Sequence, residues 1–488
     1  MGIVFLIIGV LVVGYFIGKQ SNKSSSTNTY VPPAPKEIKN SLGEVIEIAK
    51  PQPKKPKQDN LLPENLVITH EFEKALELLN NQKQSVFITG KAGTGKSTLL
   101  KIFKSKTKKE FVILSPTGIA AINVQGQTIH SFFSFPPTLI TEHTNLFDAD
   151  KIEIFKKVDM IIIDEISMVR ADLMDGIDKS LRLHRNSDEP FGGIQMVFFG
   201  DLYQLPPVVV GEELNNYFRT HYQSQYFFSA KVFDKFKFSI IELQTVFRQK
   251  DPKFINLLNN IRVGKVLDND LMTLNTRVVP NFSPVKNDLF ITLASTNAIA
   301  DNENSRRLNE LTTPSIKYIA NVTGSFEKNA YPTSQILELK QDSQVMFVKN
   351  DAGRRWANGS IGSIKSITNE KIMVELNGTS LEVPKETWEL IEYVYNKVEK
   401  KIEQIVKGTF EQYPLKLAWA VTIHKSQGQT FEQVVIDLGN GAFAHGQTYV
   451  ALSRCKSFEG IILKQSIRNR DIILDNKVQS FMQNAIVN

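Results

Sequence analysis

The chain has 488 residues, of which 42% are hydrophobic, and it carries a formal net charge of +7. That length allows two to four globular domains, and the modest basic excess permits, without requiring, a nucleic-acid or anionic-membrane partner. Cys455 is the only cysteine, so disulfides within the chain and metal sites built from several thiolates are excluded. The seven histidines show no metal-ligand spacing, which leaves Mg²⁺ held by oxygen atoms as the expected metal.

An uncharged apolar run occupies residues 2–18. As a helix it would span roughly 25 Å, close to the lower limit for crossing a bilayer. We therefore predict a transmembrane helix at residues 1–18. Lys19 and Lys23 follow it directly and favour a cytoplasmic location for the remaining chain. A cleaved signal peptide is the main alternative, but no basic segment precedes the run and no small-residue cleavage site follows it.

Residues 19–60 are rich in Ser, Asn, Thr, Pro and Lys. This composition offers too little apolar surface to pack, and its prolines favour an extended chain, so we predict a disordered linker. Its basic residues either contact anionic lipid or nucleic acid or are simply solvated, and composition leaves both alternatives open. Folded structure is expected from residue 61 onward.

Residues 90–97, Gly-Lys-Ala-Gly-Thr-Gly-Lys-Ser, match the phosphate-binding pattern G-x-x-x-x-G-K-[ST]. A short apolar strand is expected before them at 86–88 and a helix after them at 98–103, in the order that the pattern requires. The glycines let the backbone approach phosphate oxygens, Lys96 can reach the β- and γ-phosphates, and the Ser97 hydroxyl can bind Mg²⁺. We predict a nucleoside triphosphate site formed by Gly90, Lys91, Ala92, Gly93, Thr94, Gly95, Lys96, Ser97 and Thr98.

Polar side chains suited to nucleotide hydrolysis follow two further predicted strands. Residues 160–163 form an apolar run that delivers Asp164 and Glu165 to its carboxyl end. That position suits Asp164 for the Mg²⁺ shell and Glu165 for activating the attacking water. A strand at 196–199 leads to Gln204, whose amide suits a sensor of the γ-phosphate. An ordinary exit from the strand explains the same residues, and spacing alone does not separate the two.

The second half of the chain is expected to form another α/β unit. Asp251 and Pro252 begin a helix that ends at Gly264. Buried strands are expected at 289–293, 434–436 and 461–463. Because no second phosphate loop occurs, this unit would complete the site from across a cleft. Arg248 and Arg454 are candidate donors, since a guanidinium neutralises charge in a phosphoryl-transfer transition state.

Short alternating strands are expected between about residues 341 and 406. Segments 371–376 and 379–383 flank Asn377-Gly378, a strong signal for a two-residue hairpin. We therefore predict a small β-barrel inserted into the second unit. The predicted domains are a first lobe with a small hairpin insertion at 61–240, a second lobe at 241–340 and 407–488, and the barrel at 341–406.

Ten motifs in order make the chain resemble the PIF-type (petite integration frequency) DNA helicases of superfamily 1B. They include TGKAGTGKST at 89–98, IIIDEISMV at 161–169, FFGDLYQLPPVV at 198–209, AWAVTIHKSQGQTF at 418–431 and GQTYVALSRCKS at 446–457. The resemblance extends from about residue 61 to 464. It implies an α/β fold of two RecA-like P-loop NTPase lobes, with a barrel similar to a Src-homology-three domain inserted in the second.

The resemblance also implies an ATP hydrolase that moves 5′ to 3′ along single-stranded DNA and unwinds duplex ahead of it. Single-stranded and fork DNA would be its partners, and its catalytic body would act as a monomer. Gln204 would sense the γ-phosphate, and Arg248 and Arg454 would be arginine fingers. Gln427 and Gly428 match positions that couple DNA contact to nucleotide. Predicted DNA contacts are Pro116, Thr117, His130, Thr422, His424 and Lys425, with the rings of Phe132 and Phe133 able to stack on bases.

One stretch departs from the family pattern. Members commonly carry a glutamine before the phosphate loop that reads adenine, whereas residues 69–75 here contain Phe72, with Glu71 or Glu73 as substitutes. A preference for ATP over GTP is therefore less firmly implied than triphosphate binding. Three alternatives to a DNA helicase stay open. They are a membrane-tethered translocase or protein-displacing ATPase without strand separation, a nucleotide-switched binding module, and a motor that tracks RNA.

Overall fold

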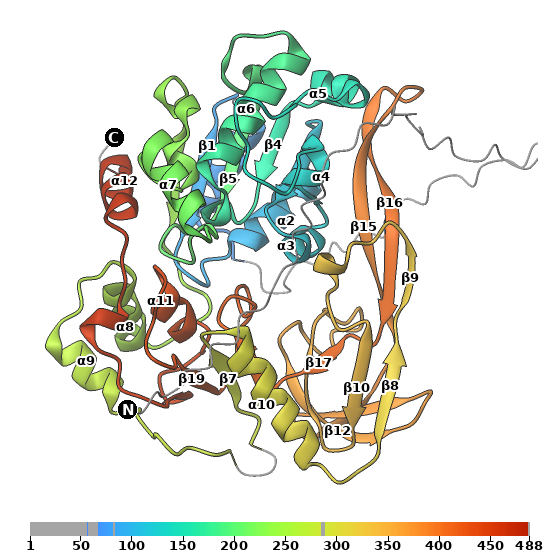
Figure 1. The fold of residues 1–488 in the computed structure, drawn as a ribbon, viewed down its shortest axis with the longest axis vertical. Helices are drawn as coiled ribbons and strands as arrows, with labels where there is room; N and C mark the ends of the chain where they lie inside the picture. Colours follow the sequence, from blue (N-terminus) through green and yellow to red (C-terminus); the bar gives the residue numbers. More distant parts are fainter. Residues whose placement is uncertain (1–55, 57–66, 82, 285–287, 487–488) are drawn as a thin grey trace, which may run out of the picture. The chain divides into compact units, whose positions relative to one another are not determined.

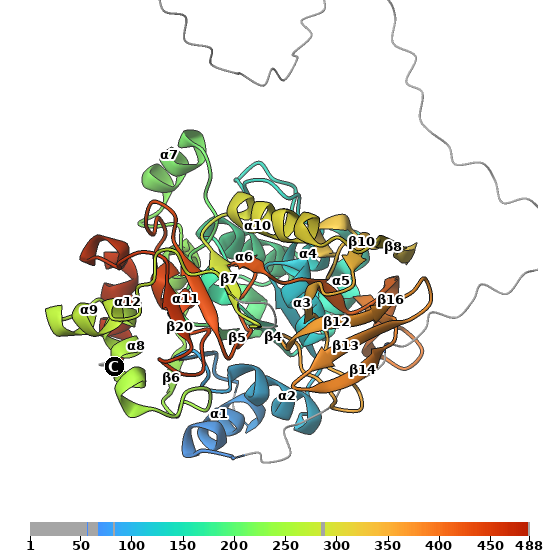
Figure 2. The same cartoon turned by 90° about the horizontal axis from the view of Figure 1, so that it is seen from below.

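The computed structural model describes residues 56, 67–81, 83–284 and 288–486. The predicted transmembrane helix at 1–18 and the predicted linker at 19–60, apart from Pro56, lie outside the described residues. Within the described part of the chain, no helix combines the length and the apolar character needed to cross a bilayer. Figures 1 and 2 label the helices and strands from two directions.

The first lobe is built on a six-stranded sheet in the order β3-β2-β4-β5-β1-β6, and every strand pair in it is parallel. A parallel sheet is covered on both faces, which is why its central strands are continuous apolar runs rather than alternating ones. The strands are β1 (Val86–Gly90), β2 (Phe111–Ser115), β3 (Gln127–Thr128), β4 (Met160–Ile163), β5 (Gln195–Phe199) and β6 (Ser239–Leu243). The helices are α1 (His70–Asn81), α2 (Lys96–Lys106), α3 (Gly118–Val124), α4 (Ile129–Phe133), α5 (Ile152–Lys157), α6 (Ala171–Arg185) and α7 (Glu212–His221).

Two apolar clusters cover the two faces of this sheet. Val86 and Ile88 of β1 pack with α1 and α2 on one face, whereas Phe87 packs with α4, α5 and α6 on the other. This is the two-residue alternation of a strand, and it confirms the predicted strand before the phosphate loop. Because all strand pairs here are parallel, the small hairpin predicted within 61–240 is absent from the described residues of this lobe. The last strand, β6, extends beyond the predicted boundary at residue 240.

The second lobe has a four-stranded parallel sheet in the order β18-β7-β19-β20. Helix α8 begins as predicted, because the Asp251 carboxylate accepts hydrogen bonds from the backbone N–H groups of Lys253 and Phe254 and Pro252 opens the helix. The strands are β7 (Ile291–Ala294), β18 (Ala420–Thr422), β19 (Val434–Asp437) and β20 (Ile461–Leu463). The helices are α8 (Pro252–Arg262), α9 (Asp268–Asn275), α10 (Asn297–Glu310), α11 (Gln447–Leu452) and α12 (Asn476–Ile486).

Antiparallel strands are inserted between α10 and β18. The predicted hairpin is confirmed, with Asn377 and Gly378 at φ 50° and 79° joining β13 to β14. The sheets have the orders β14-β13-β12-β11-β17, β10-β8 and β15-β16-β9. These strands are β8 (Ser315–Ile319), β9 (Asn321–Gly324), β10 (Ile336–Lys340), β11 (Gln344–Phe347), β12 (Ile361–Ile367), β13 (Ile372–Leu376), β14 (Thr379–Val383), β15 (Glu386–Asn396), β16 (Lys401–Gln412) and β17 (Leu415–Leu417). They extend beyond the predicted range of 341–406 at both ends, because β8 to β10 and β17 complete its sheets.

The long hairpin of β15 and β16 contacts the first lobe, where it lies beside α3 and α5 (Figure 1). Tyr393 is buried in the core of that lobe, and its hydroxyl accepts hydrogen bonds from the Ile113 backbone N–H at 3.1 Å and from Gln404 at 3.0 Å. The Tyr393 backbone N–H donates to the Gln127 side chain at 3.0 Å. The hairpin is therefore fixed to β2 and β3 by buried polar contacts.

Helix α12 packs against the first lobe, although its sequence lies in the range predicted for the second. Val478 and Met482 are fully buried in the apolar cluster of the first lobe, and the Phe481 ring stacks on Phe228 at 4.3 Å. An apolar face on a terminal helix indicates that the helix packs against another part of the protein. Which lobe it packs against can be seen only in the folded structure. The assignment of the whole of 407–488 to the second lobe is wrong for this helix.

We expect Tyr393→Phe to destabilise the protein, because the ring still fills its site while the Ile113 N–H loses its buried acceptor. An unsatisfied buried donor costs about 1–3 kcal/mol. Urea unfolding without DNA measures the change. Tyr395→Phe is the matched control, since the Tyr395 hydroxyl has no hydrogen bond to a described residue, and equal effects of the two changes would contradict the assigned contact.

Candidate active site

The phosphate loop joins β1 to α2 and needs glycine at two positions. Gly93 and Gly95 have φ of 82° and 84°, a left-handed conformation that side chains disfavour. A Cβ atom added at Gly93 would lie 2.4 Å from the Cβ of Arg248, and the Gly93 carbonyl accepts a hydrogen bond from the Phe247 N–H at 2.9 Å. The segment that enters the second lobe therefore rests directly on the phosphate loop.

Lys96 is the first residue of α2 and bends back over the loop. Its Nζ donates to the carbonyl oxygens of Gly90 at 2.7 Å and of Lys91 at 3.2 Å. Desolvation lowers the pKa of Lys96, and the charges of Asp201 and Glu165 oppose that shift. The loop thus holds a desolvated ammonium group at the start of a helix, where it would meet a bound anion.

Asp164 and Glu165 stand at the carboxyl end of β4, as predicted from the sequence. Burial and the charge of Glu165 raise the pKa of Asp164 to about 7. Burial also raises the pKa of Glu165, against the charges of Lys96 and Arg454. Glu165 has a φ of 53°, an uncommon conformation for a residue with a side chain, of the kind that concentrates at functional sites.

Gln204 and the two predicted arginines come together with the phosphate loop around one cavity of about 540 Å³. Gln204 is 8% exposed, and its Nε2 donates to Asp201 at 3.2 Å. The cavity is lined by Val67, Phe72, Ala92, Gly93, Thr94, Gly95, Lys96, Ser97, Thr98, Glu165, Gln204, Phe247, Arg248, Gly428, Thr430, Arg454 and Lys456. The predicted residues Gly90, Lys91, Asp164 and Gln427 lie outside this lining.

Arg248 and Arg454 supply further positive charge to the cavity that the phosphate loop lines. Arg248 donates to the Ser453 carbonyl at 3.0 Å, and Arg454 donates to the carbonyl of Val450 and the hydroxyl of Ser453. Burial and the charge of Arg248 lower the pKa of Arg454 to about 9. Among the described residues neither guanidinium has a carboxylate within ion-pair distance, so their charges remain available to an anionic ligand.

Several residues of this cavity carry no clear signal in the sequence. Val67, Phe72 and Phe247 give one wall an apolar surface, and Phe72 occupies the stretch where family members commonly carry glutamine. The cavity lining contains neither Glu71 nor Glu73, the two substitutes suggested by the sequence. Tyr449 of α11 accepts a hydrogen bond from the Ala92 N–H at 2.9 Å, a contact between residues 357 positions apart. Local patterns cannot predict such a pairing.

The predicted DNA contacts follow the carboxyl ends of strands in both lobes. In the first lobe, Pro116 is half-buried, the exposed Thr117 caps α3 by accepting from the Ala120 N–H, and His130 is half-buried. Desolvation lowers the pKa of His130, which favours its neutral form. Thr117 and His130 therefore offer hydrogen-bonding groups rather than fixed charge.

In the second lobe, the predicted DNA contacts lie at the end of β18 and directly after it. Thr422 is buried and its hydroxyl accepts a hydrogen bond from the Lys425 N–H at 3.2 Å. Lys425 itself is exposed, and His424 is half-buried with a pKa lowered by desolvation. Lys425 is thus the group of this segment best placed to meet a phosphate in solvent.

The prediction that the rings of Phe132 and Phe133 stack on DNA bases is wrong for this structure. Their rings are 0% and 2% exposed and lie in the aromatic core of the first lobe. Phe132 packs against Phe155 at 5.4 Å and against Tyr393 at 6.1 Å. Helix α4 has only five residues, so its sequence did not show which face points inward.

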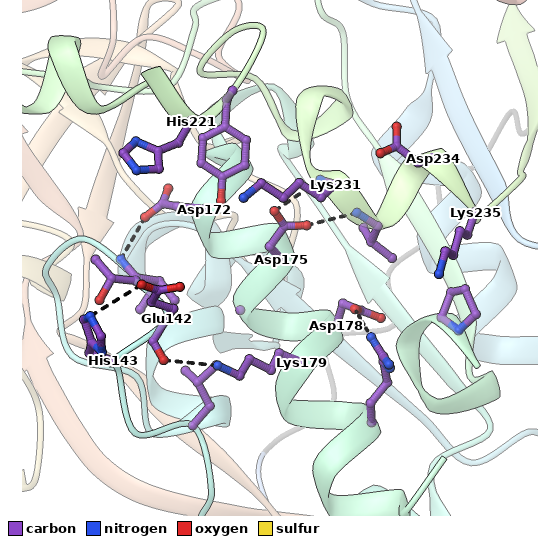
Figure 3. A pocket seen from close by; sticks show the side chains of 18 of the residues that line it. Glu142, His143, Asp172, Asp175, Asp178, Lys179, His221, Lys231, Asp234 and Lys235 are labelled. Atoms are coloured by element: carbon purple, nitrogen blue, oxygen red, sulfur yellow. Dashed lines mark hydrogen bonds and ion pairs between the residues drawn. The ribbon is translucent and has the colours of Figure 1, made fainter. Parts of the chain in front are cut away.

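A larger cavity, of about 760 Å³, lies between α6, α7 and the loop at 140–146 (Figure 3). Two of its carboxylates, those of Asp175 and Asp178, are already hydrogen-bonded within the protein. Asp175 accepts from the backbone N–H groups of Lys231 and Val232, and Asp178 accepts from that of Phe191. Burial raises the pKa of both aspartates. Volume alone would select this cavity, but the predicted nucleotide-binding residues surround the smaller one.

Comparison with known proteins agrees with the motifs. Residues 67–271 match the family model described as PIF1-like helicase. The ATP-dependent DNA helicase Pif1 of Bdellovibrio bacteriovorus is 33% identical over 434 residues, which is 85% of this chain and 93% of that protein. The chain belongs to the PIF1-like helicase family. The ATP-dependent DNA helicase PIF1 of Emericella nidulans is 31% identical over 84% of the chain, but the match spans only 62% of that relative.

Solved structures of PIF1-like helicases share the fold. A Bacteroides sp Pif1 in complex with ADP-AlF4 superposes with a TM-score of 0.81 at 36% identity, over 87% of this chain and 98% of that one. A Bacteroides Pif1 bound to single-stranded DNA gives a TM-score of 0.63 at 37% identity. Since the identities are nearly equal, the arrangement described here differs more from that of the DNA-bound protein.

We expect Phe132→Leu to lower the free energy of unfolding by about 1 kcal/mol or more, because it leaves a gap in a close-packed core. Its affinity for single-stranded DNA should stay within about twofold, whereas loss of a stacked base would cost about 1–3 kcal/mol. Thermal unfolding and fluorescence anisotropy measure the two quantities. Lys425→Ala is the contrasting control, with weaker DNA binding and unchanged stability. The core assignment would be contradicted by a large loss of affinity in a stable Phe132→Leu protein.

Proposed function

We propose that this chain is an ATP-driven DNA helicase that moves 5′ to 3′ on single-stranded DNA and unwinds duplex ahead of it. The observation that carries the proposal is the cavity between the lobes. The first lobe contributes Lys96, Glu165 and Gln204. Arg248 comes from the segment that leads into the second lobe, and Arg454 comes from the second lobe itself. Family membership and the names of the relatives, ATP-dependent DNA helicases, support the same activity.

Each group has a distinct task in hydrolysis. The phosphate-loop backbone and Lys96 bind the β- and γ-phosphates, and Gln204 contacts the terminal phosphate. Glu165 accepts the proton of the attacking water, a role that its raised pKa favours. Arg248 and Arg454 stabilise the negative charge that develops on the transferred phosphoryl group.

The residues present fit a magnesium ion. Ser97 lies in the first turn of α2 with an exposed side chain, and Asp164 directly follows β4. A hydroxyl and a carboxylate, together with phosphate oxygens and water, are the oxygen donors that Mg²⁺ prefers. The Ser115 hydroxyl at the end of the neighbouring strand β2 is buried and has no hydrogen-bond partner among the described residues. This edge of the sheet therefore has a polar group available to bond a ligand or a water molecule. When bound there, the ion neutralises phosphate charge.

Coupling to DNA follows from the segment after β18. The DNA-contact candidates Thr422, His424 and Lys425 are followed at once by Gln427 and by Gly428, which lines the cavity. A change at the terminal phosphate is therefore only a few residues from a surface that holds the DNA backbone. Lobe closure on ATP and reopening after hydrolysis would move that surface relative to Thr117 and the rest of the first lobe.

Hydrolysis in the presence and absence of single-stranded DNA tests the proposal. We expect phosphate release to be strongly stimulated by DNA and to fall by about 100-fold or more in Lys96→Ala and Glu165→Gln. Exposed positions supply the matched controls Lys365→Ala and Glu310→Gln, which should behave like wild type. Turnover that is the same with and without DNA would contradict the proposed motor. GTP is run beside ATP, because Val67, Phe72 and Phe247 of the apolar wall have no side-chain hydrogen-bonding group that could distinguish the two bases.

A fork-unwinding assay then separates the helicase from the alternative of a translocase. Strand separation at a fork with a 5′ single-stranded tail, and none with a 3′ tail, supports the proposed direction. Protein displacement without strand separation would favour the translocase. Faster ATP turnover with RNA than with DNA would favour a motor that moves along RNA. Light scattering of the protein alone tests the expected monomer.

We also propose a membrane anchor at residues 1–18. This part of the proposal rests on the sequence alone, since the segment lies outside the described residues. The support is its uncharged apolar length and the lysines that follow it. Fractionation of cells that express the full chain, beside a chain lacking residues 1–18, tests it. The anchor is contradicted if both proteins remain in the supernatant after membranes are removed.

A further inference from the structure

A buried arginine outside the nucleotide cavity joins the two lobes. Arg262 is the last residue of α8, and its side chain is 4% exposed. Its Nη2 donates to Oδ1 of Asp201 at 2.9 Å, and its Nη1 donates to Oε1 of Glu242 at 3.2 Å. The guanidinium also lies over the ring of Tyr203, with Cζ 4.4 Å from the ring centroid. All three partners belong to the first lobe.

Asp201 divides its two carboxylate oxygens between Arg262 and Gln204. While Oδ1 accepts from Arg262, Oδ2 accepts from Nε2 of Gln204 at 3.2 Å. The Gln204 backbone N–H also donates to the Asp201 carbonyl at 2.9 Å. Gln204 lines the nucleotide cavity, whereas Asp201 and Arg262 do not. A chain of two hydrogen bonds thus leads from a helix of the second lobe to an amide in the cavity.

The Asp201–Arg262 pair is charged and depends on both partners. Asp201 is 1% exposed, and a carboxylate at that depth needs a partner to remain ionised. Burial raises the pKa of Asp201, but the charges of Arg262 and Lys96 and the hydrogen bonds outweigh it, so the pKa lies below its usual value. Only the planar fork of arginine can bond two carboxylates and cover an aromatic ring at once.

We propose that Arg262 is a positioning residue for hydrolysis, which orients the Gln204 amide through Asp201 and makes contact with the terminal phosphate depend on the position of the second lobe. Opening of the lobes withdraws Arg262 from Asp201, and the carboxylate that accepts from the Gln204 amide then loses the group that holds it in place. The inference rests on the proposed function, because it assigns Gln204 to the terminal phosphate. It adds a residue that no motif of the sequence analysis singled out.

Arg262→Lys tests the role, because lysine keeps the charge but cannot bond both carboxylates. With saturating single-stranded DNA, we expect kcat to fall about 10- to 100-fold, the cost of a misplaced group near the reacting phosphate. KM for ATP and the affinity for ADP should stay within about twofold, since phosphate-loop contacts are intact. Arg306→Lys, at an exposed ion pair on α10, is the matched control. A purely structural role would instead lower the melting temperature and leave the kcat of the folded protein unchanged.

A double-mutant cycle with Gln204→Ala identifies the route of the effect. If Arg262 acts through Gln204, Arg262→Lys changes kcat by less than about twofold when Gln204 is already alanine. Equal fold-changes in both backgrounds overturn the inference, and so does an unchanged kcat in Arg262→Lys. Should Arg262→Lys fail to fold, Asp201→Asn replaces it in the same cycle, because its amide keeps the shape of the carboxylate. Wild-type protein without DNA-stimulated turnover would contradict the proposed function itself, which distinguishes the two failures.

Discussion

Desolvated positive charge in the cavity between the lobes is the constraint on which the structure depends. Lys96, Arg248 and Arg454 converge there, and in the described structure they donate to backbone carbonyls and a hydroxyl instead of to carboxylates. Burial lowers the pKa of each of them, because keeping a charged group from water costs free energy. A bound polyanion would offset that cost, and it would do so for charges that come from both lobes.

In the proposed function, the position of these charges on two lobes couples nucleotide binding to movement of the lobes. Lys96 belongs to the first lobe and Arg454 to the second, so a bound phosphate chain would attract both lobes at once. The lobes also approach closely at Gly446, where an added Cβ would lie 2.3 Å from the Tyr203 carbonyl oxygen. Such contacts form or break as units, which suits a cycle of closing and reopening.

Buried polar contacts and one apolar helix connect the remaining parts. Tyr393 fixes the long hairpin to the first lobe, α12 covers an aromatic surface of the same lobe, and Arg262 bridges α8 to Asp201. Polar pairs of this kind contribute less to stability than apolar packing, but they specify one arrangement and are lost when a partner withdraws. These contacts define the position of the second lobe and its insertion relative to the first lobe, and they can be broken when the lobes separate.

Local sequence patterns alone predict the phosphate loop, the strand that leads to Asp164 and Glu165, and the hairpin turn at Asn377 and Gly378. Each depends on neighbours in the chain, because backbone conformation and strand alternation are local properties. Tertiary structure decided that Phe132 is in the core and that α12 covers the first lobe. The pairing of Arg262 with Asp201 and of Tyr449 with Ala92, 61 and 357 residues apart, also depends on the tertiary structure. The physical reason is that burial and charge pairing depend on which surfaces meet in space, and spacing along the chain does not contain that information.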